Sequence, residues 1–169
     1  MPAIVAVVLL LASLGACAAP QSITGTVKRV LDGDSVIVRA SGRDIEVRLG
    51  EIDTPEKGQP YADISRKALQ GMLIDERVRL QVLDRDQYGR TVARVYRLPE
   101  ELWINAEMVR RGHAWVYRRH VRDKGLYEIE RDAQARRAGL WALPEAERAP
   151  PWQWRRIHPP EHSTNPRTN

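Results

Sequence analysis

The sequence contains a single cysteine, Cys17, among its 169 residues. A disulfide within the chain is therefore excluded, as is a zinc site built mainly from cysteine ligands. The four histidines lack the spacing of metal ligands, so we interpret them as surface or structural residues: His113, His120, His158 and His162. The sequence thus predicts no thiol- or imidazole-based metal centre.

Charged residues are absent before Lys28, and residues 3–12 form an apolar run. The run is too short to span a bilayer and fits the core of a signal peptide. The nearby residues Leu14-Gly15-Ala16-Cys17 resemble the bacterial lipobox, in which cleavage before the cysteine is coupled to lipidation of its sulfur. The segment departs from that pattern because no Lys or Arg precedes the run, so an ordinary export signal with an incidental cysteine is the alternative. The protein is expected to be an exported, membrane-anchored lipoprotein at a periplasmic or cell-surface face, or secreted if Cys17 is not lipidated.

Four segments are predicted: a signal peptide (1–16), a short linker (17–22), one folded domain (23–142) and a tail (143–169). A single domain suits the length, and 43% hydrophobic with 29% charged residues is typical of a globular protein. The formal charge of +5 weakly favours a polyanionic partner. The tail is rich in Pro and Arg and cannot fold alone, although Trp152 and Trp154 can pin it to the domain.

Alternating apolar and charged residues predict short β-strands in the first part of the domain. In "RDIEVRLG" the apolar Ile45, Val47 and Leu49 share one face, and Asp-Gly between two apolar runs indicates a hairpin. The strands predicted in this way cover 23–30, 35–40, 43–50, 77–83 and 90–97. Five short strands with tight turns indicate a small barrel, and hence a mainly β member of the α+β class.

Three helices are predicted from apolar residues at helical spacing. They cover Ala62 to Leu73, Leu102 to Arg111 and Leu126 to Ala138. Gly112 and Gly139 follow the second and third segments and are suitable end signals.

Two acidic segments are candidates for chemistry. Asp34 closes the hairpin sequence Asp-Gly-Asp, and Asp53-Thr54-Pro55-Glu56 follows the third strand. Each can be a mere turn with solvated carboxylates. If they meet, however, Asp34 and Asp53 can supply carboxylates and Thr54 a carbonyl to Ca²⁺, which prefers oxygen ligands. Glu56 would then lie near the ion as a general base for water.

Two arginines lie close in sequence to these carboxylates. Arg48 precedes Asp53 by five residues, and Arg90 begins the last predicted strand. With 27 Lys and Arg residues in the chain, a surface position is the simpler interpretation of either one. A phosphodiester under attack gains negative charge, however, and two guanidinium groups can stabilise it through paired hydrogen bonds.

The motifs "VLDGDSVIV", "RLGEIDTPE", "DQYGR" and "GLW" resemble, in order and approximate spacing, the staphylococcal-nuclease-like thermonucleases. The resemblance covers about residues 23–141. It implies an OB-fold, a five-stranded barrel with three helices, and a Ca²⁺-dependent enzyme that hydrolyses DNA and RNA and typically leaves 3′-phosphates. It also implies low sequence specificity, because such a site holds phosphate and stacks bases.

The resemblance assigns roles to individual residues. It implies that Asp34, Asp53 and Thr54 bind Ca²⁺, that Glu56 is the base, and that Arg48 and Arg90 bind the phosphate. Tyr88, Trp115 and Tyr117 are the candidates for substrate binding; Tyr117 is similar to an aromatic residue of the nucleotide pocket, and Trp115 replaces a second tyrosine. Gln87 stands where some members have Lys, and Ser35 where Thr is commoner. We expect the protein to act as a monomer on DNA and/or RNA.

Two other functions compete with the nuclease. The first is an OB-fold lipoprotein that binds nucleic acid without cutting it, although a decayed site would be expected to have lost Glu56 or an arginine. The second is a surface lipoprotein whose basic tail docks on anionic lipid or an envelope polymer. Truncation after Leu143 tests the second function, which fails if the truncated protein keeps its location.

Overall fold

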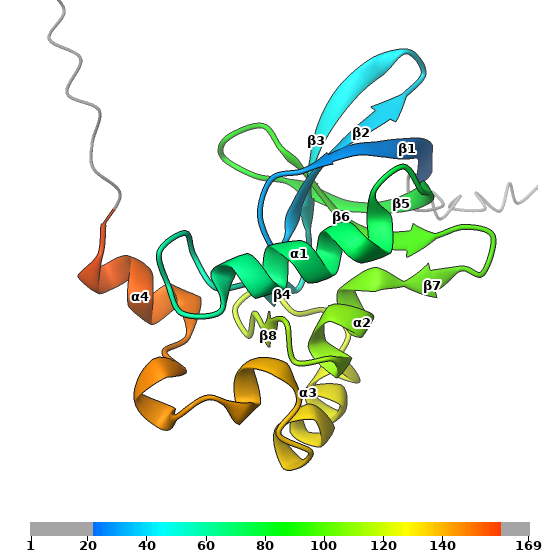
Figure 1. Cartoon of the computed structure of the whole chain (residues 1–169). Helices are drawn as coiled ribbons and strands as arrows, with labels where there is room; N and C mark the ends of the chain where they lie inside the picture. The colour runs from blue at the N-terminus through cyan, green and yellow to red at the C-terminus, as the bar shows by residue number, and fades with distance from the viewer. Residues whose placement is uncertain (1–21, 160–169) are drawn as a thin grey trace, which may run out of the picture.

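The computed structural model describes residues 22–159, which form a barrel with helices packed against one side (Figure 1). Its strands are β1 (Ser22–Val30), β2 (Ser35–Ala40), β3 (Arg43–Leu49), β4 (Ile52–Asp53), β5 (Arg77–Arg85), β6 (Thr91–Arg97), β7 (Leu102–Trp103) and β8 (Trp115–Val116). Its helices are α1 (Ala62–Leu73), α2 (Ile104–Arg110), α3 (Leu126–Ala135) and α4 (Pro151–Ile157), with short 3-10 helices η1 (Gly139–Ala142) and η2 (Glu145–Glu147). Among residues 22–159, no helix is long and apolar enough to cross a membrane.

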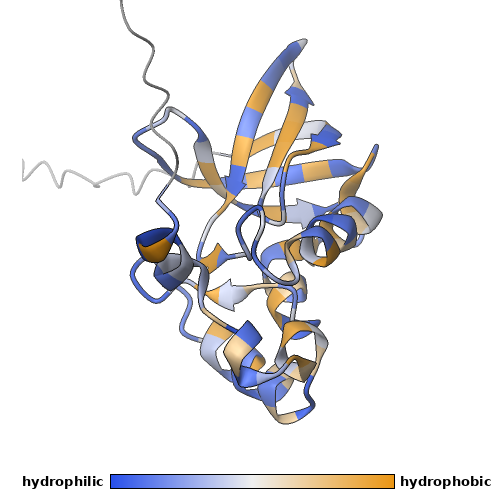
Figure 2. Cartoon of the chain, turned by 60° about the vertical axis from the view of Figure 1, so that its left-hand side comes forward, coloured by the Kyte–Doolittle hydropathy of each residue, from blue (hydrophilic) through white to orange (hydrophobic). Residues whose placement is uncertain are grey.

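Five strands close into the barrel in the order β3-β2-β1-β5-β6, and a parallel pairing of β3 with β6 completes it. Alternation explains the closure, because inward residues such as Val36, Val38, Leu80 and Val95 are fully buried. Figure 2 shows hydrophobic and hydrophilic residues alternating along these strands. The predicted five-stranded, mainly β barrel of the OB-fold type is confirmed.

Three helices occupy the predicted segments, although α3 ends at Ala135 instead of the predicted Ala138. Helix α1 has the predicted bounds, whereas α2 begins later because Leu102 and Trp103 pair with β6 as strand β7. The predicted count of three helices is wrong for the described residues, because α4 adds a fourth. This helix is only seven residues long and starts with Pro151 at its first position, so its sequence lacks a sustained helical period.

Two buried polar side chains, Asn105 and Glu51, hold the loops near the C-terminal end of β3 in place. Asn105 of α2 accepts a hydrogen bond from the Val95 N–H and donates to the carbonyls of Gly50 and Ala93. Glu51, which has a φ of 68°, accepts hydrogen bonds of 2.7 Å from the backbone N–H groups of Arg122 and Asp123. These contacts hold the loops after β3 and β8 in place.

The Glu51 carboxylate also pairs with Arg94 on β6, at 2.5 Å between Oε2 and Nε. Burial alone would raise the pKa of Glu51, but the hydrogen bonds from Arg94, Asp123 and Arg122 outweigh it and hold the pKa below its ordinary value. Although it lies beside the predicted catalytic carboxylates in sequence, Glu51 thus acts as an anchor for the loop at 117–123.

We predict that Glu51→Gln lowers the free energy of unfolding by about 3 kcal/mol at neutral pH, because Arg94 loses its charged partner. The folded-state pKa lies below the ordinary 4.5, so the Glu51 contribution is present above pH 4.5 and is lost as the pH falls through the folded-state pKa. Urea unfolding from neutral to acid pH measures both effects. The control is Glu101→Gln, which breaks the exposed pair with Arg79 and should change stability far less. Equal losses in the two variants would contradict the anchoring role.

Candidate functional site

One cavity of about 930 Å³ gathers most of the predicted site residues. It opens where β2 begins, β3 ends and β6 begins, and it also touches the loops after β4 and β8. The predicted residues in its lining are Asp34, Arg48, Asp53, Thr54, Glu56, Tyr88, Arg90 and Tyr117. Trp115 is not in the lining, and Cys17 lies outside the described residues. The fold therefore brings together the residues predicted to bind metal, activate water and bind phosphate.

Asp34 reaches this cavity because its loop packs closely on the segment after β4. The Asp34 N–H bonds to Asp32 Oδ1 at 2.9 Å, and Asp34 Oδ2 accepts a 3.1 Å hydrogen bond from the Thr54 N–H. A Cβ on Gly33 would lie 2.3 Å from Ser65 Oγ and 2.7 Å from Thr54 Oγ1. Only glycine therefore permits this approach, which joins the two acidic segments.

Arg48 lies between the two buried aspartates. Its Nη2 is 2.9 Å from Asp53 Oδ1 and 3.5 Å from Asp34 Oδ2. Its Nη1 donates to the carbonyls of Leu49 and Ile52 at 3.0 and 3.1 Å. The guanidinium of Arg48 thus neutralises the carboxylates of Asp34 and Asp53. Phosphate binding by Arg48 stays a prediction, because the guanidinium would have to exchange a carboxylate contact for a phosphate contact.

Burial disfavours the ionised form of two carboxyl groups in the cavity, those of Asp53 and Asp32. Burial is the largest cause that raises the pKa of Asp53 to about 6, and the charge of Asp34 adds to it, while Arg155 and Arg48 act in the opposite direction. Burial likewise raises the pKa of Asp32 to about 6, with the charge of Asp34 as the next cause. Additional positive charge in the cavity would therefore stabilise the ionised carboxylates.

Arg155 of α4 supplies such a charge and was missed by sequence reasoning. Its Nη2 lies 2.8 Å from Asp53 Oδ2, and its Nη1 pairs with both Asp53 Oδ1, at 3.2 Å, and Glu56 Oε1. The predicted base is therefore ion-paired with the C-terminal segment. No sequence pattern signals a contact across about one hundred residues, since Arg155 is one of many arginines in a tail without periodicity.

The segment that carries Arg155 is fixed beside the cavity. Gln59, in the loop before α1, donates a hydrogen bond from Nε2 to the Ala149 carbonyl at 2.5 Å. Figure 1 shows α4 next to this loop. Trp152 packs edge-on against Trp115 at 5.9 Å between ring centroids. The docked helix thus forms one wall of the site.

Arg90 is oriented by a neighbour in its own turn. Its Nε donates to Asp86 Oδ2 at 2.7 Å, and its N–H donates to Asp86 Oδ1 at 3.0 Å. Its guanidinium carbon lies 5.6 Å from the centre of the exposed Tyr88 ring. Within residues 22–159 its terminal nitrogens make no hydrogen bond, so they can bind an anionic oxygen.

The aromatic candidates separate into two groups. Tyr117 and Tyr88 line the cavity. Trp115 packs on Trp141, with 4.3 Å between ring centroids, and helps to attach η1 to the domain. The structure therefore brings only the two tyrosines to the site.

The oxygen donors suit a hard cation. No group of three or more His, Cys, Asp or Glu side chains in the described segment is arranged to hold a metal. The carboxylates of Asp34 and Asp53 face one guanidinium, so a single ion between them would have two charged ligands and need backbone carbonyl and water oxygens for the rest. That donor set, oxygen alone, fits Ca²⁺ and does not suit zinc.

Comparisons with known proteins identify the family of the chain. Residues 46–143 match the family model described as staphylococcal nuclease homologue. The chain is 38% identical over 163 residues to a protein named micrococcal nuclease from Shigella flexneri, covering 91% of each chain. It is 40% identical over 141 residues to protein ParB from Escherichia coli, covering 78% of each. It is 38% identical over 144 residues to an uncharacterized endonuclease from Haemophilus influenzae, covering 85% of this chain and 78% of that one. The chain therefore belongs to the staphylococcal nuclease family, and the prediction of a nuclease, a phosphodiester hydrolase, is confirmed.

Proposed function

We propose that this nuclease is calcium-dependent, hydrolyses DNA and/or RNA with low sequence specificity, and works from the cavity that holds Asp53, Glu56, Arg48 and Arg90. The observation that carries the proposal is the presence of two aspartates, a glutamate and two arginines in the lining of one cavity, in a chain with a net charge of +5. Each group has a defined task in phosphodiester hydrolysis.

The residues that would hold the ion are Asp34 and Asp53 through their carboxylates and Thr54 through its carbonyl. When bound, Ca²⁺ supplies positive charge to a phosphoryl oxygen and to the attacking water. The raised pKa of Asp53 supports this assignment, because the carboxylate gains more from a cation than an exposed group would.

The Glu56 carboxylate accepts a proton from the water whose oxygen forms the new bond to phosphorus. The phosphorus–O5′ bond breaks, the O5′ leaving group takes up a proton from a solvent water, and the phosphate stays on the 3′ oxygen. Arg90, and Arg48 after it exchanges a carboxylate contact, donate hydrogen bonds to the phosphoryl oxygens as their charge grows. None of these contacts involves a base edge, which accounts for the low specificity.

We predict that Glu56→Gln lowers kcat by roughly 10²- to 10⁴-fold, because a positioned general base contributes about that factor. Digestion of plasmid DNA and of RNA by the full chain in Ca²⁺, Mg²⁺ or a chelator measures it. Glu46→Gln, on the exposed face of β3, is the matched control and should cleave like the wild type. Equal cleavage by both variants would remove Glu56 from the mechanism.

The alternative to hydrolysis is binding of nucleic acid without cleavage, and the one observation on its side is the ion pair in which Arg155 occupies the Glu56 carboxylate. Cleavage by the wild type in any divalent cation excludes this candidate. Binding of nucleic acid without cleavage under every condition would establish it.

We predict that Arg155→Ala raises the affinity for Ca²⁺ several-fold, because the variant removes a cation that competes for Asp53. Isothermal titration calorimetry without nucleic acid measures the change. Arg156→Ala removes an arginine from the same helix without touching the carboxylates, and it should leave the affinity within about twofold. An unchanged or weaker affinity in Arg155→Ala would contradict competition at Asp53.

We also propose that the protein is exported and anchored through lipid on Cys17, on the strength of the apolar run and the lipobox-like residues before it. Two or more acyl chains make such anchoring stable. We predict that the wild type expressed in a bacterial cell fractionates with membranes and incorporates labelled palmitate, whereas Cys17→Ser does neither. The lipid anchor would be rejected if the wild type and Cys17→Ser associated equally with membranes and the wild type incorporated no palmitate.

A further inference from the structure

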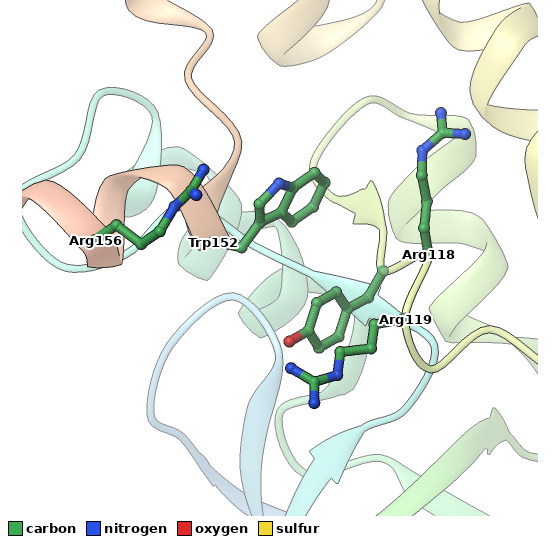
Figure 3. Close-up of a pocket in the computed structure, with 5 residues that line it drawn as sticks. Arg118, Arg119, Trp152 and Arg156 are labelled. Carbon is green, nitrogen blue, oxygen red and sulfur yellow. The ribbon is translucent and has the colours of Figure 1, made fainter.

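A second cavity, of about 390 Å³, lies between helix α4 and the segment that follows β8 (Figure 3). It is lined by two aromatic and three basic residues, with no acidic side chain among them: Tyr117, Trp152, Arg118, Arg119 and Arg156. Tyr117 and Arg119 line both cavities, so the two cavities are adjacent. Aromatic rings combined with cations are the chemistry that binds unpaired nucleotides.

The two aromatic rings face each other in a way that suits a planar ligand. The rings of Tyr117 and Trp152 are nearly parallel, with an interplanar angle of 17° and 6.0 Å between centroids. A base stacked between them needs two stacking separations of about 3.4 Å, or roughly 7 Å in all. Because the two rings already stack on each other, they have to part before a base can enter between them, which a side-chain adjustment on binding can supply.

Two of the three arginines are placed for the phosphate of such a nucleotide. Arg118 is 3.3 Å from Glu130 and extends away from Arg119 in Figure 3. Arg119 and Arg156 are exposed and form no ion pair among the described residues. They lie on opposite sides of the ring pair, from the loop after β8 and from α4, and so can contact the sugar-phosphate chain as it leaves the first cavity.

Helix α4 presents these groups together with Arg155. Trp152, Arg155 and Arg156 stand at positions i, i+3 and i+4 and therefore share a helix face. That face lies outside residues 46–143, the segment that matches the family model. The second cavity is thus formed between the segment that matches the family model and helix α4, which lies after it.

We propose that Tyr117 and helix α4 form a binding subsite for the nucleotide next to the scissile linkage in a single-stranded nucleic acid. Its base stacks between Tyr117 and Trp152, and its phosphate is held by Arg119 and Arg156. The proposal rests on the proposed nuclease function, because the first cavity has to hold the scissile linkage. A duplex has its bases stacked and paired, so it cannot use this subsite without being unwound.

The test measures binding of a fluorescent single-stranded oligonucleotide to the full chain by anisotropy, in chelator so that no cleavage occurs. Trp152→Ala is expected to weaken binding about 5- to 150-fold, the usual effect of losing one stacking residue. Trp154→Ala is the matched control, since this tryptophan lies on the same helix but stacks on His158, and it should change binding less than twofold. Duplex binding should be the same for both variants.

A second set of binding measurements tests whether the loss of affinity belongs to one base and to the phosphate of the same nucleotide. A series of oligonucleotides, each lacking one base, should show a penalty at one position with the wild type and none there with Trp152→Ala. Arg156→Gln, an exposed change that leaves the ring pair intact, should reduce the salt dependence of binding by about one ion. Circular dichroism confirms that each variant is folded, and Trp152→Phe should recover most of the binding.

The outcomes separate this subsite from the nuclease itself. Equal binding by the Trp152 and Trp154 variants, or no base-dependent penalty at any position, overturns the subsite while cleavage by the wild type upholds the nuclease. A Trp152-dependent penalty without cleavage in any divalent cation supports the subsite and rejects the catalytic proposal. Tighter binding by Trp152→Ala overturns the subsite and identifies α4 as a cover over the active cavity.

Discussion

The repulsion between the buried carboxylates of Asp34 and Asp53 is the constraint on which the site depends. Both side chains are held close to Arg48, and the charge of Asp34 helps to raise the pKa of Asp53. A site of this kind is stable only if positive charge remains between or beside the acids. Arg48 and Arg155 supply it here, and a divalent ion can supply it when the site is loaded. The same electrostatic demand thus explains the guanidinium contacts seen in the structure and the cation proposed for catalysis.

Barrel closure and the C-terminal helix bring the remaining parts to this pair. The parallel pairing of β3 with β6 places Arg90 near Arg48, and the close approach at Gly33 joins Asp34 to Thr54. Helix α4 then contributes Arg155 to the first cavity and Trp152 to the second. The tail is therefore part of the cavity wall, and any account of substrate access has to include its contacts with Asp53, Glu56 and Tyr117.

The barrel and the acidic ligands could be predicted because they follow from local patterns. Apolar and charged residues alternate along β3 from Asp44 to Leu49, and Asp34 and Asp53 lie at strand ends, where loops of a barrel converge. The sequence could not reveal the ion-pair partner of each charged side chain. Arg48 pairs with the carboxylate of Asp53 inside the site. Glu51 has a positive φ and pairs with Arg94, whereas Glu56, a residue of the same type, lines the cavity. Nothing in the sequence distinguishes these two glutamates. Helix α4 was missed because contacts made by Trp152 and Arg155, rather than helical periodicity, hold it in place.

The most direct test is a crystal structure of the full chain with Glu56→Gln, soaked with Ca²⁺ and a short single-stranded oligonucleotide. The account predicts an ion bound by Asp34 and Asp53, Arg155 displaced from Asp53, and a phosphate within hydrogen-bond distance of Arg90. An oligonucleotide bound on another face, with the guanidinium of Arg155 still on Asp53 and no ion beside Asp34, would contradict it.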